Sequence, residues 1–145
     1  MEYSFDKSLG HLSQVISKNL GSNLEKKLIE NGISLTAEQW SVISLVYHKK
    51  DLNQNAIANT YGFDKVRVLR ILNVLEAEKI IYRTTDALDK RSRKVNISDK
   101  GVSLYHKIVP LAQETIDNAL KSLTQEEVSQ YMQLSGRIIQ NLSSK

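Results

Sequence analysis

Two clusters of basic residues stand out in the sequence, because arginine and lysine side chains can bind nucleic acids. The first lies in a segment with helical periodicity, where Arg67 and Arg70 stand beside the apolar residues Val66 and Leu69. In the major groove of DNA, arginine can pair with guanine and apolar side chains can contact thymine methyl groups. The alternative interpretation is a solvated basic helix face that carries a few stray apolar residues.

The second cluster has four basic residues within five positions, between two short segments of β type: Lys90, Arg91, Arg93 and Lys94. A basic hairpin tip by itself is usually only a soluble loop. A basic hairpin that directly follows a helix-turn-helix is instead placed to contact the DNA backbone or the neighbouring minor groove. The meaning of this cluster therefore depends on the segment before it.

The charge distribution supports a polyanionic partner. The chain has a net charge of +4, and residues 64–100 contain ten Lys or Arg against six Asp or Glu. The rest of the chain contains ten of each, so all of the excess positive charge falls in one central quarter of the sequence. A region that binds nucleic acid is expected to concentrate charge in this way.

Other kinds of chemistry find little support. His11, His48 and His106 are far apart, and neither a His-x-x-x-His pair nor any cysteine is present, so we expect no metal site. The absence of cysteine also excludes disulfides and thiol-based peroxide sensing. We find no nucleophile with a neighbouring base and no glycine-rich phosphate loop. We therefore predict no catalytic residues, no cofactor and no enzymatic activity.

The spacing of apolar residues and of capping residues predicts six helices and one β-hairpin. The first helix is expected from Phe5 to about Ile29, and Asn31-Gly32 should end it. Pro110 should kink or split the fifth helix. The other helices are expected at about 36–49, 54–61, 64–79, 98–122 and 124–142, and the β segments at 80–86 and 93–98, with an extended link at 51–53.

The third and fourth predicted helices match the helix-turn-helix pattern. Gly62 stands where the turn needs a positive φ, and Asn53 and Asp64 can cap the two helices. The constrained positions are Ile57, Ala58, Tyr61, Gly62, Phe63, Val68 and Ile71. The fourth helix should bury Val68, Ile71, Leu72 and Leu75 and should present Val66, Arg70, Asn73 and Ala77, flanked by Arg67 and Leu69, with Lys65 able to reach outward from the first turn.

Several motifs resemble those of the MarR family of regulators, and the resemblance extends over essentially the whole chain. The matching motifs are Gln39-Trp40, Leu52-Asn53-Gln54, Ala58…Gly62…Asp64-Lys65, Leu75-Glu76, Ile80-Ile81-Tyr82-Arg83, Asp86-x-x-Asp89-Lys90-Arg91 and Ser98-Asp99-Lys100-Gly101. The resemblance implies a triangular homodimer held by the first, fifth and sixth helices. It also implies that Arg91 enters the minor groove and that Asp89 helps to shape the wing.

The chain departs from this family at a few positions. Val66 and Leu69 stand where the family often has Ser or Thr, which affects the DNA sequence that would be bound. Lys79 replaces a usual glycine, Ala87 a usual proline and Ala56 a common acidic residue. The turn into the hairpin, the hairpin tip and the cap of the third helix are therefore expected to differ locally.

We therefore predict a mainly α fold with a small β-hairpin wing, as one domain of residues 1–145. A winged helix-turn-helix lobe should span 34–100, and dimerisation helices should span 1–32 and 101–145. No stretch approaches 18 consecutive apolar residues, and the N-terminus lacks a basic region followed by an apolar run, so we expect neither a membrane span nor a signal peptide. We therefore predict a cytoplasmic protein with no membrane partner. The candidate DNA-binding residues are Asn53, Asp64, Lys65, Val66, Arg67, Leu69, Arg70, Asn73, Lys90, Arg91, Arg93 and Lys94.

The expected function is sequence-specific regulation of transcription by a homodimer, as a repressor bound to a near-palindromic operator in double-stranded DNA. The resemblance also allows for release by a small phenolic or aromatic-acid ligand. His11, Trp40 and Tyr47 are candidates to line its pocket, with core packing as the other role of Trp40 and Tyr47. The alternative function is a winged-helix module that binds protein and not DNA.

Overall fold

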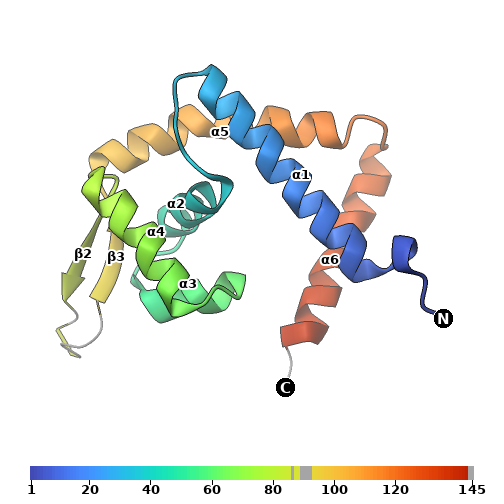
Figure 1. Cartoon of the computed structure of the whole chain (residues 1–145), viewed down its shortest axis with the longest axis horizontal. Coiled ribbons are helices and arrows are strands. Elements are labelled where there is room, and N and C mark those ends of the chain that lie inside the picture. Colours follow the sequence, from blue (N-terminus) through green and yellow to red (C-terminus); the bar gives the residue numbers. More distant parts are fainter. Residues whose placement is uncertain (86, 89–92, 144–145) are drawn as a thin grey trace.

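The computed structural model describes residues 1–85, 87–88 and 93–143, and Figure 1 shows how its helices and strands are arranged. A 3-10 turn at Phe5–Lys7 precedes the first helix. The helices are α1 (Leu9–Glu30), α2 (Ala37–His48), α3 (Gln54–Tyr61), α4 (Lys65–Ala77), α5 (Asp99–Ala119) and α6 (Gln125–Ser143). The strands are β1 (Leu52–Asn53), β2 (Ile81–Thr85) and β3 (Arg93–Ile97). The mainly helical fold with a small β wing is confirmed.

The helices begin where the sequence supplies a capping side chain. Thr36 and Gln39 form the complete capping box of α2, and the carboxylate of Asp64 accepts a hydrogen bond of 2.7 Å from the backbone N–H of Arg67. The first helix starts later than expected, at Leu9, because Ser8 is extended and accepts from the backbone of His11 as an N-cap. Each cap satisfies an N–H group that would otherwise lack a partner.

The helix ends confirm the roles of two glycines and reveal a strained lysine. Gly32 and Gly62 have φ of 75° and 68°, and both end a helix. The helix α4 ends at Ala77, two residues earlier than expected, and Lys79 then takes a φ of 62°. The N–H of Ile80 donates to the carbonyl of Leu75, which completes a Schellman-type end that normally uses glycine. The chain thus holds a side chain in a conformation that disfavours one.

Two other expectations need correction. Helix α5 continues through Pro110, which is exposed, so the expected split of this helix does not occur. The link at Leu52–Asn53 is a strand, because Leu52 pairs with Val95 and Asn53 with Lys94. The expected hairpin is therefore the larger part of a three-stranded antiparallel sheet with the order β1-β3-β2.

The main core lies between α2, α3, α4, the sheet and the start of α5. Gly101 allows α5 to approach this core, since a Cβ there would collide with the carbonyl oxygen of Ile80. A smaller core joins α1 to α5 through Leu24, Leu28 and Ile108. Tyr61 is an exception to the expected helix-turn-helix core, because it is 39% exposed and its hydroxyl donates to the carbonyl of Ser41.

The terminal helices extend away from this core. Figure 1 shows that α1 crosses α5 and that α6 extends down from the end of α5, far from the sheet. Over its described residues α6 has no buried side chain, although it carries many large apolar ones. Among the described helices, none is both long and apolar enough to cross a membrane.

Candidate nucleic-acid interface

The outer face of α4 has the composition that the sequence predicts. Val68 and Leu72 are fully buried, which fixes the rotation of the helix. Val66 is 67% exposed and Leu69 is 42% exposed, and Arg70, one turn after Val66, is exposed as well. Exposed apolar side chains at these positions are unfavourable in water and match the thymine methyl groups of a major groove.

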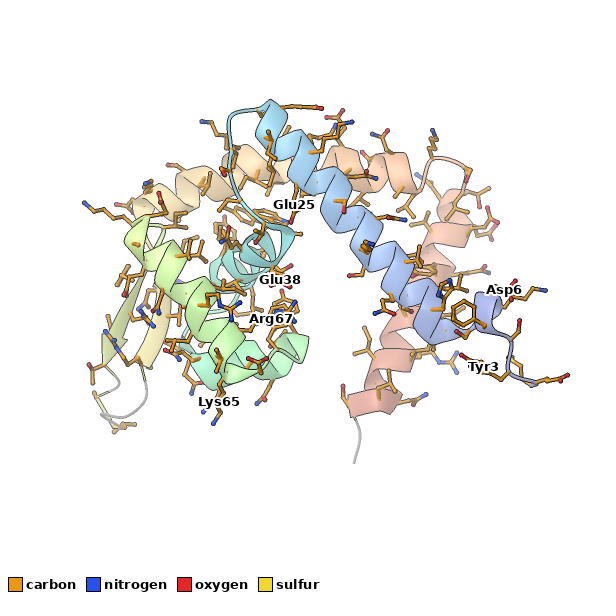
Figure 2. The ribbon with its side chains drawn as sticks, viewed as in Figure 1. Tyr3, Asp6, Glu25, Glu38, Lys65 and Arg67 are labelled. Atoms are coloured by element: carbon orange, nitrogen blue, oxygen red, sulfur yellow. The ribbon has the colours of Figure 1, made fainter. Side chains whose placement is uncertain are left out.

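Arg70 and Lys65 are available for an external partner. Within the described part of the chain, neither side chain makes a hydrogen bond or an ion pair. Figure 2 shows Lys65 at the N-terminal end of α4, pointing away from the body of the protein. The amino terminus of a helix also carries a partial positive charge, which favours phosphate.

Arg67 is placed differently from the expectation. Its guanidinium forms a two-pronged ion pair with Glu38, in the first turn of α2, with Nε 3.1 Å from Oε2. The same guanidinium lies 4.4 Å from the centre of the Phe63 ring. Figure 2 shows Arg67 directed toward Glu38 and not outward with Lys65. Arg67 is therefore occupied within the protein, whereas Arg70 is not.

Two other candidates act as structural caps. The carbonyl oxygen of the Asn53 side chain accepts from the backbone of Ala56 at 2.8 Å, and Asp64 caps α4. Both residues position the helices of the motif. On β3, Arg93 is exposed and Lys94 lies 3.4 Å from a carboxylate oxygen of Asp51. The candidates Lys90 and Arg91, with Asp89, lie outside the described residues.

Arg83, which lies on β2 beside α4, has a role that was not expected from the sequence. Its side chain is only 7% exposed and donates two hydrogen bonds to the carboxylate of Glu76, at 2.8 and 3.2 Å. It also donates to the side-chain oxygens of Asn73 at 2.8 Å and of Gln54 at 3.2 Å. The hydrogen bond from Arg83 holds the pKa of Glu76 below its usual value. The alternation in β2 is a usable signal, since Arg83 shares a face with buried Ile81.

A pocket of about 520 Å³ lies between α1, α2, α5 and the turn that leads into α4. Its aromatic wall consists of Trp40, Tyr61 and Phe63, and Arg67 and Glu38 stand at its polar side. Partial burial raises the pKa of Tyr61, so its hydroxyl remains a donor. The pocket thus joins an apolar wall to one ion pair.

The three candidates for a ligand site are not brought together. Trp40 lines this pocket, but His11 lies at the far end of α1, with its ring 4.6 Å from that of Phe5. Tyr47 stacks on Tyr105 with ring centres 3.7 Å apart, which is the packing role given as the alternative. Trp40 also packs against Tyr105, at 5.5 Å.

The fold and the exposed face of α4 define a winged helix-turn-helix protein, and comparison with known proteins shows which family it resembles. Residues 31–92 match the model of the MarR family. The HTH-type transcriptional regulator MhqR of Bacillus subtilis (strain 168) is 23% identical over 121 residues, which are 83% of this chain and 82% of MhqR. The chain is therefore similar to the MarR family, whose members are transcriptional regulators and not enzymes.

Solved structures share the fold of nearly the whole chain. The complex of MepR from S. aureus with DNA superposes with a TM-score of 0.79 at 24% identity, covering 92% of this chain and 98% of MepR. BpsR from Bordetella bronchiseptica, whose DNA binding is regulated by 6-hydroxynicotinic acid, superposes with a TM-score of 0.82 at 19% identity, covering both chains completely. At these identities the likeness concerns the fold.

Proposed function

We propose that this regulator binds double-stranded DNA in a sequence-specific way, with α4 in the major groove. The observation that carries the proposal is the outer face of α4, where Val66, Leu69 and Arg70 are exposed side by side and the arginine has no partner among the described residues. Arginine that pairs with guanine and apolar groups that meet thymine methyls together distinguish base pairs. Because Arg67 is already paired with Glu38, Arg70 is the main arginine for base contacts.

The β2–β3 hairpin is the wing in this proposal. Arg93 and Lys94 at the tip end of β3, with Lys90 and Arg91 from the segment that joins the strands, would contact phosphates or the neighbouring minor groove. Contacts of this kind position the protein on the duplex and strengthen binding to every sequence alike. They account for the excess positive charge of the central quarter of the chain.

We propose that the functional unit is a homodimer. The N-terminal part of α1 and most of α6 expose large apolar side chains that the subunit leaves uncovered, and a second copy would cover them: Leu9, Leu12, Val15, Ile16, Tyr131, Met132, Leu134, Ile139 and Leu142. A surface of this composition is typical of a permanent interface. Two-fold symmetry then requires a near-palindromic operator, with half-sites about 10 to 10.5 base pairs apart.

We further propose that the protein is a repressor and that an aromatic acid in the 520 Å³ pocket releases it from DNA. An aromatic ring would stack against Trp40 and Phe63, and the acid group would pair with Arg67 in place of Glu38. Arg67 is in the first turn of α4, so a change of its partner acts directly on the helix that contacts DNA. The regulation of BpsR by 6-hydroxynicotinic acid is in line with this chemistry.

Selection of bound duplexes from a random library, followed by salt titration of the affinity, tests the proposal. The expected product is an inverted repeat with the half-site spacing given above, bound much more tightly than a scrambled duplex of the same composition. Failure to retain any duplex at low salt would contradict DNA binding. It would favour the alternative, a winged-helix module that binds protein.

A further inference from the structure

The buried guanidinium of Arg83 connects three parts of the DNA-binding motif. From β2 it donates to Glu76 and Asn73 on α4 and to Gln54, the first residue of α3. Glu76 takes two of these hydrogen bonds and balances the positive charge of the arginine. Two of the three remaining N–H groups are directed to the two side-chain amides.

This arrangement dictates which way each amide faces. A guanidinium carries only donors, so an amide bound to it must turn its oxygen toward it. The orientation of Asn73 and Gln54 is therefore required by the chemistry of Arg83, and does not depend on distinguishing oxygen from nitrogen by their positions alone. In both residues the NH2 group is left on the side away from Arg83.

The position of Asn73 places that NH2 group on the surface proposed to contact bases. Asn73 follows Arg70 by three positions and Val66 by seven, so the three residues share one face of α4. Asn73 is exposed, as are the other two residues. Gln54, at the first position of α3, is half-buried beside the same network.

We propose that Arg83 is a positioning residue that presents Asn73 and Gln54 to DNA as hydrogen-bond donors only. The inference rests on the proposed function, since it concerns the same DNA surface. Asn73 then favours the acceptors that adenine lacks, namely O6 of guanine or O4 of thymine. Adenine offers only N7 to such a donor, since the bidentate contact with adenine needs the amide oxygen and nitrogen side by side in the groove. Gln54 donates to a phosphate oxygen and contributes no base preference.

The test compares the base preference of the wild-type protein with that of Asn73→Ala. Each base pair of the selected half-site is replaced in turn by the other three, and the affinities of both proteins are measured. We expect one position at which the wild type prefers guanine or thymine by about tenfold, the factor that corresponds to one base-specific contact. This preference should disappear in Asn73→Ala. The inference would be overturned if the position that depends on Asn73 prefers adenine. It would also be overturned if no position loses its base preference in Asn73→Ala.

A second variant separates the donor role from the structural role. In Asn73→Asp the carboxylate still accepts from Arg83 but has no group to donate, so we expect a melting temperature at least as high as the wild type and an affinity for the best site at least tenfold lower. Asn118→Asp, at an exposed position of α5, is the matched charge control and should change affinity less than twofold. A lower melting temperature of Asn73→Asp with unchanged DNA affinity would contradict the proposed orientation.

Arg83→Lys tests the positioning residue itself. A lysine retains the charge but cannot hold a carboxylate and two amides in fixed directions at once. We expect the variant to accept adenine where the wild type rejects it. A folded Arg83→Lys protein with the full wild-type base preference would show that Arg83 does not set the orientation of the Asn73 amide. If this variant fails to fold, the two substitutions at Asn73 still decide the inference. A wild-type protein that binds no duplex would contradict the proposed function instead.

Discussion

Arg67 and Glu38 form an ion pair between the first turn of α4 and the first turn of α2, with Nε and Oε2 3.1 Å apart. The pair connects the helix proposed to contact bases with the wall of the 520 Å³ pocket. Phe63 lies under the same guanidinium and extends the contact to the turn of the helix-turn-helix. Changes in the pocket can therefore reach the surface proposed to contact DNA through this ion pair.

Glu38→Gln is expected to strengthen binding to all DNA sequences. Both side chains of the pair are well exposed, so its loss should lower the free energy of unfolding by less than about 1 kcal/mol. The released Arg67 can then contact a phosphate, which should steepen the dependence of log affinity on log salt by about one unit. Salt titrations measure the slope, and Glu126→Gln, at the exposed start of α6, is the charge control. An unchanged slope would mean that Phe63 alone holds Arg67.

Arg70→Ala and Arg93→Ala are both expected to weaken DNA binding, but with different dependence on the DNA sequence. Loss of a bidentate guanine contact from Arg70 should cost about 1–3 kcal/mol on the best site and relax the preference at one position of each half-site. Loss of Arg93 should weaken best and scrambled duplexes equally and flatten the salt slope by about one unit. Fluorescence anisotropy on both duplexes measures these effects. Equal losses on both duplexes from Arg70→Ala would argue against its role in base contacts.

The dimer should depend on the apolar face of α6. Sedimentation at micromolar concentration is expected to give about twice the chain mass of 16.5 kDa. The double substitution of Tyr131 and Leu134 by Asp should give a monomer with weaker DNA binding, because two charges would be buried without partners. Ser103→Asp, an exposed position on α5, should leave the dimer intact. A wild-type monomer at this concentration would contradict the proposed assembly.

Lys79→Gly is expected to stabilise the fold. Lys79 has a φ of 62°, where a side chain is disfavoured, and the gain should be roughly 0.5–1 kcal/mol after the greater freedom of glycine in the unfolded chain is deducted. Glu78→Gly is the matched control, since Glu78 has a φ of −81° and should lose roughly 0.5–1 kcal/mol. Urea unfolding at fixed protein concentration compares the two. A loss of stability in both variants would show that contacts of the Lys79 side chain stabilise the fold by more than its backbone strain destabilises it.

Aromatic carboxylates are expected to quench the fluorescence of Trp40, which is the only tryptophan and lines the pocket. The corresponding amides should bind about tenfold more weakly, because they cannot pair with Arg67 as an anion. In Arg67→Met the acid and the amide should bind alike, whereas Lys65→Met removes a neighbouring charge outside this pocket and should keep the difference. Acids that bind in the pocket without releasing the protein from DNA would show that the pocket does not regulate DNA binding.

Local signals in the sequence were sufficient for the elements and for the rotation of the key helix. The caps at Thr36 and Asp64 act within one turn, and Gly62 ends α3 through its own backbone freedom, so each can be recognised from a few neighbouring residues. The period of 3.6 residues likewise placed Val68 and Leu72 inside and Val66 outside. The resemblance to the MarR family rests on the same kind of short motif, which can be recognised from residues close together in the sequence.

Tertiary structure alone decided which partners the functional side chains have. Arg67 meets Glu38 and Arg83 meets Gln54, each across 29 positions of the chain, and β1 joins β3 across more than 40. Periodicity shows that a side chain faces outward but not which carboxylate lies within reach, because this depends on how α2, α4 and the sheet pack together. For the same reason Trp40 lines the pocket while His11 and Tyr47 do not. The direction in which the Asn73 amide faces likewise follows from a tertiary contact, the hydrogen bond of 2.8 Å that its oxygen accepts from the buried guanidinium of Arg83.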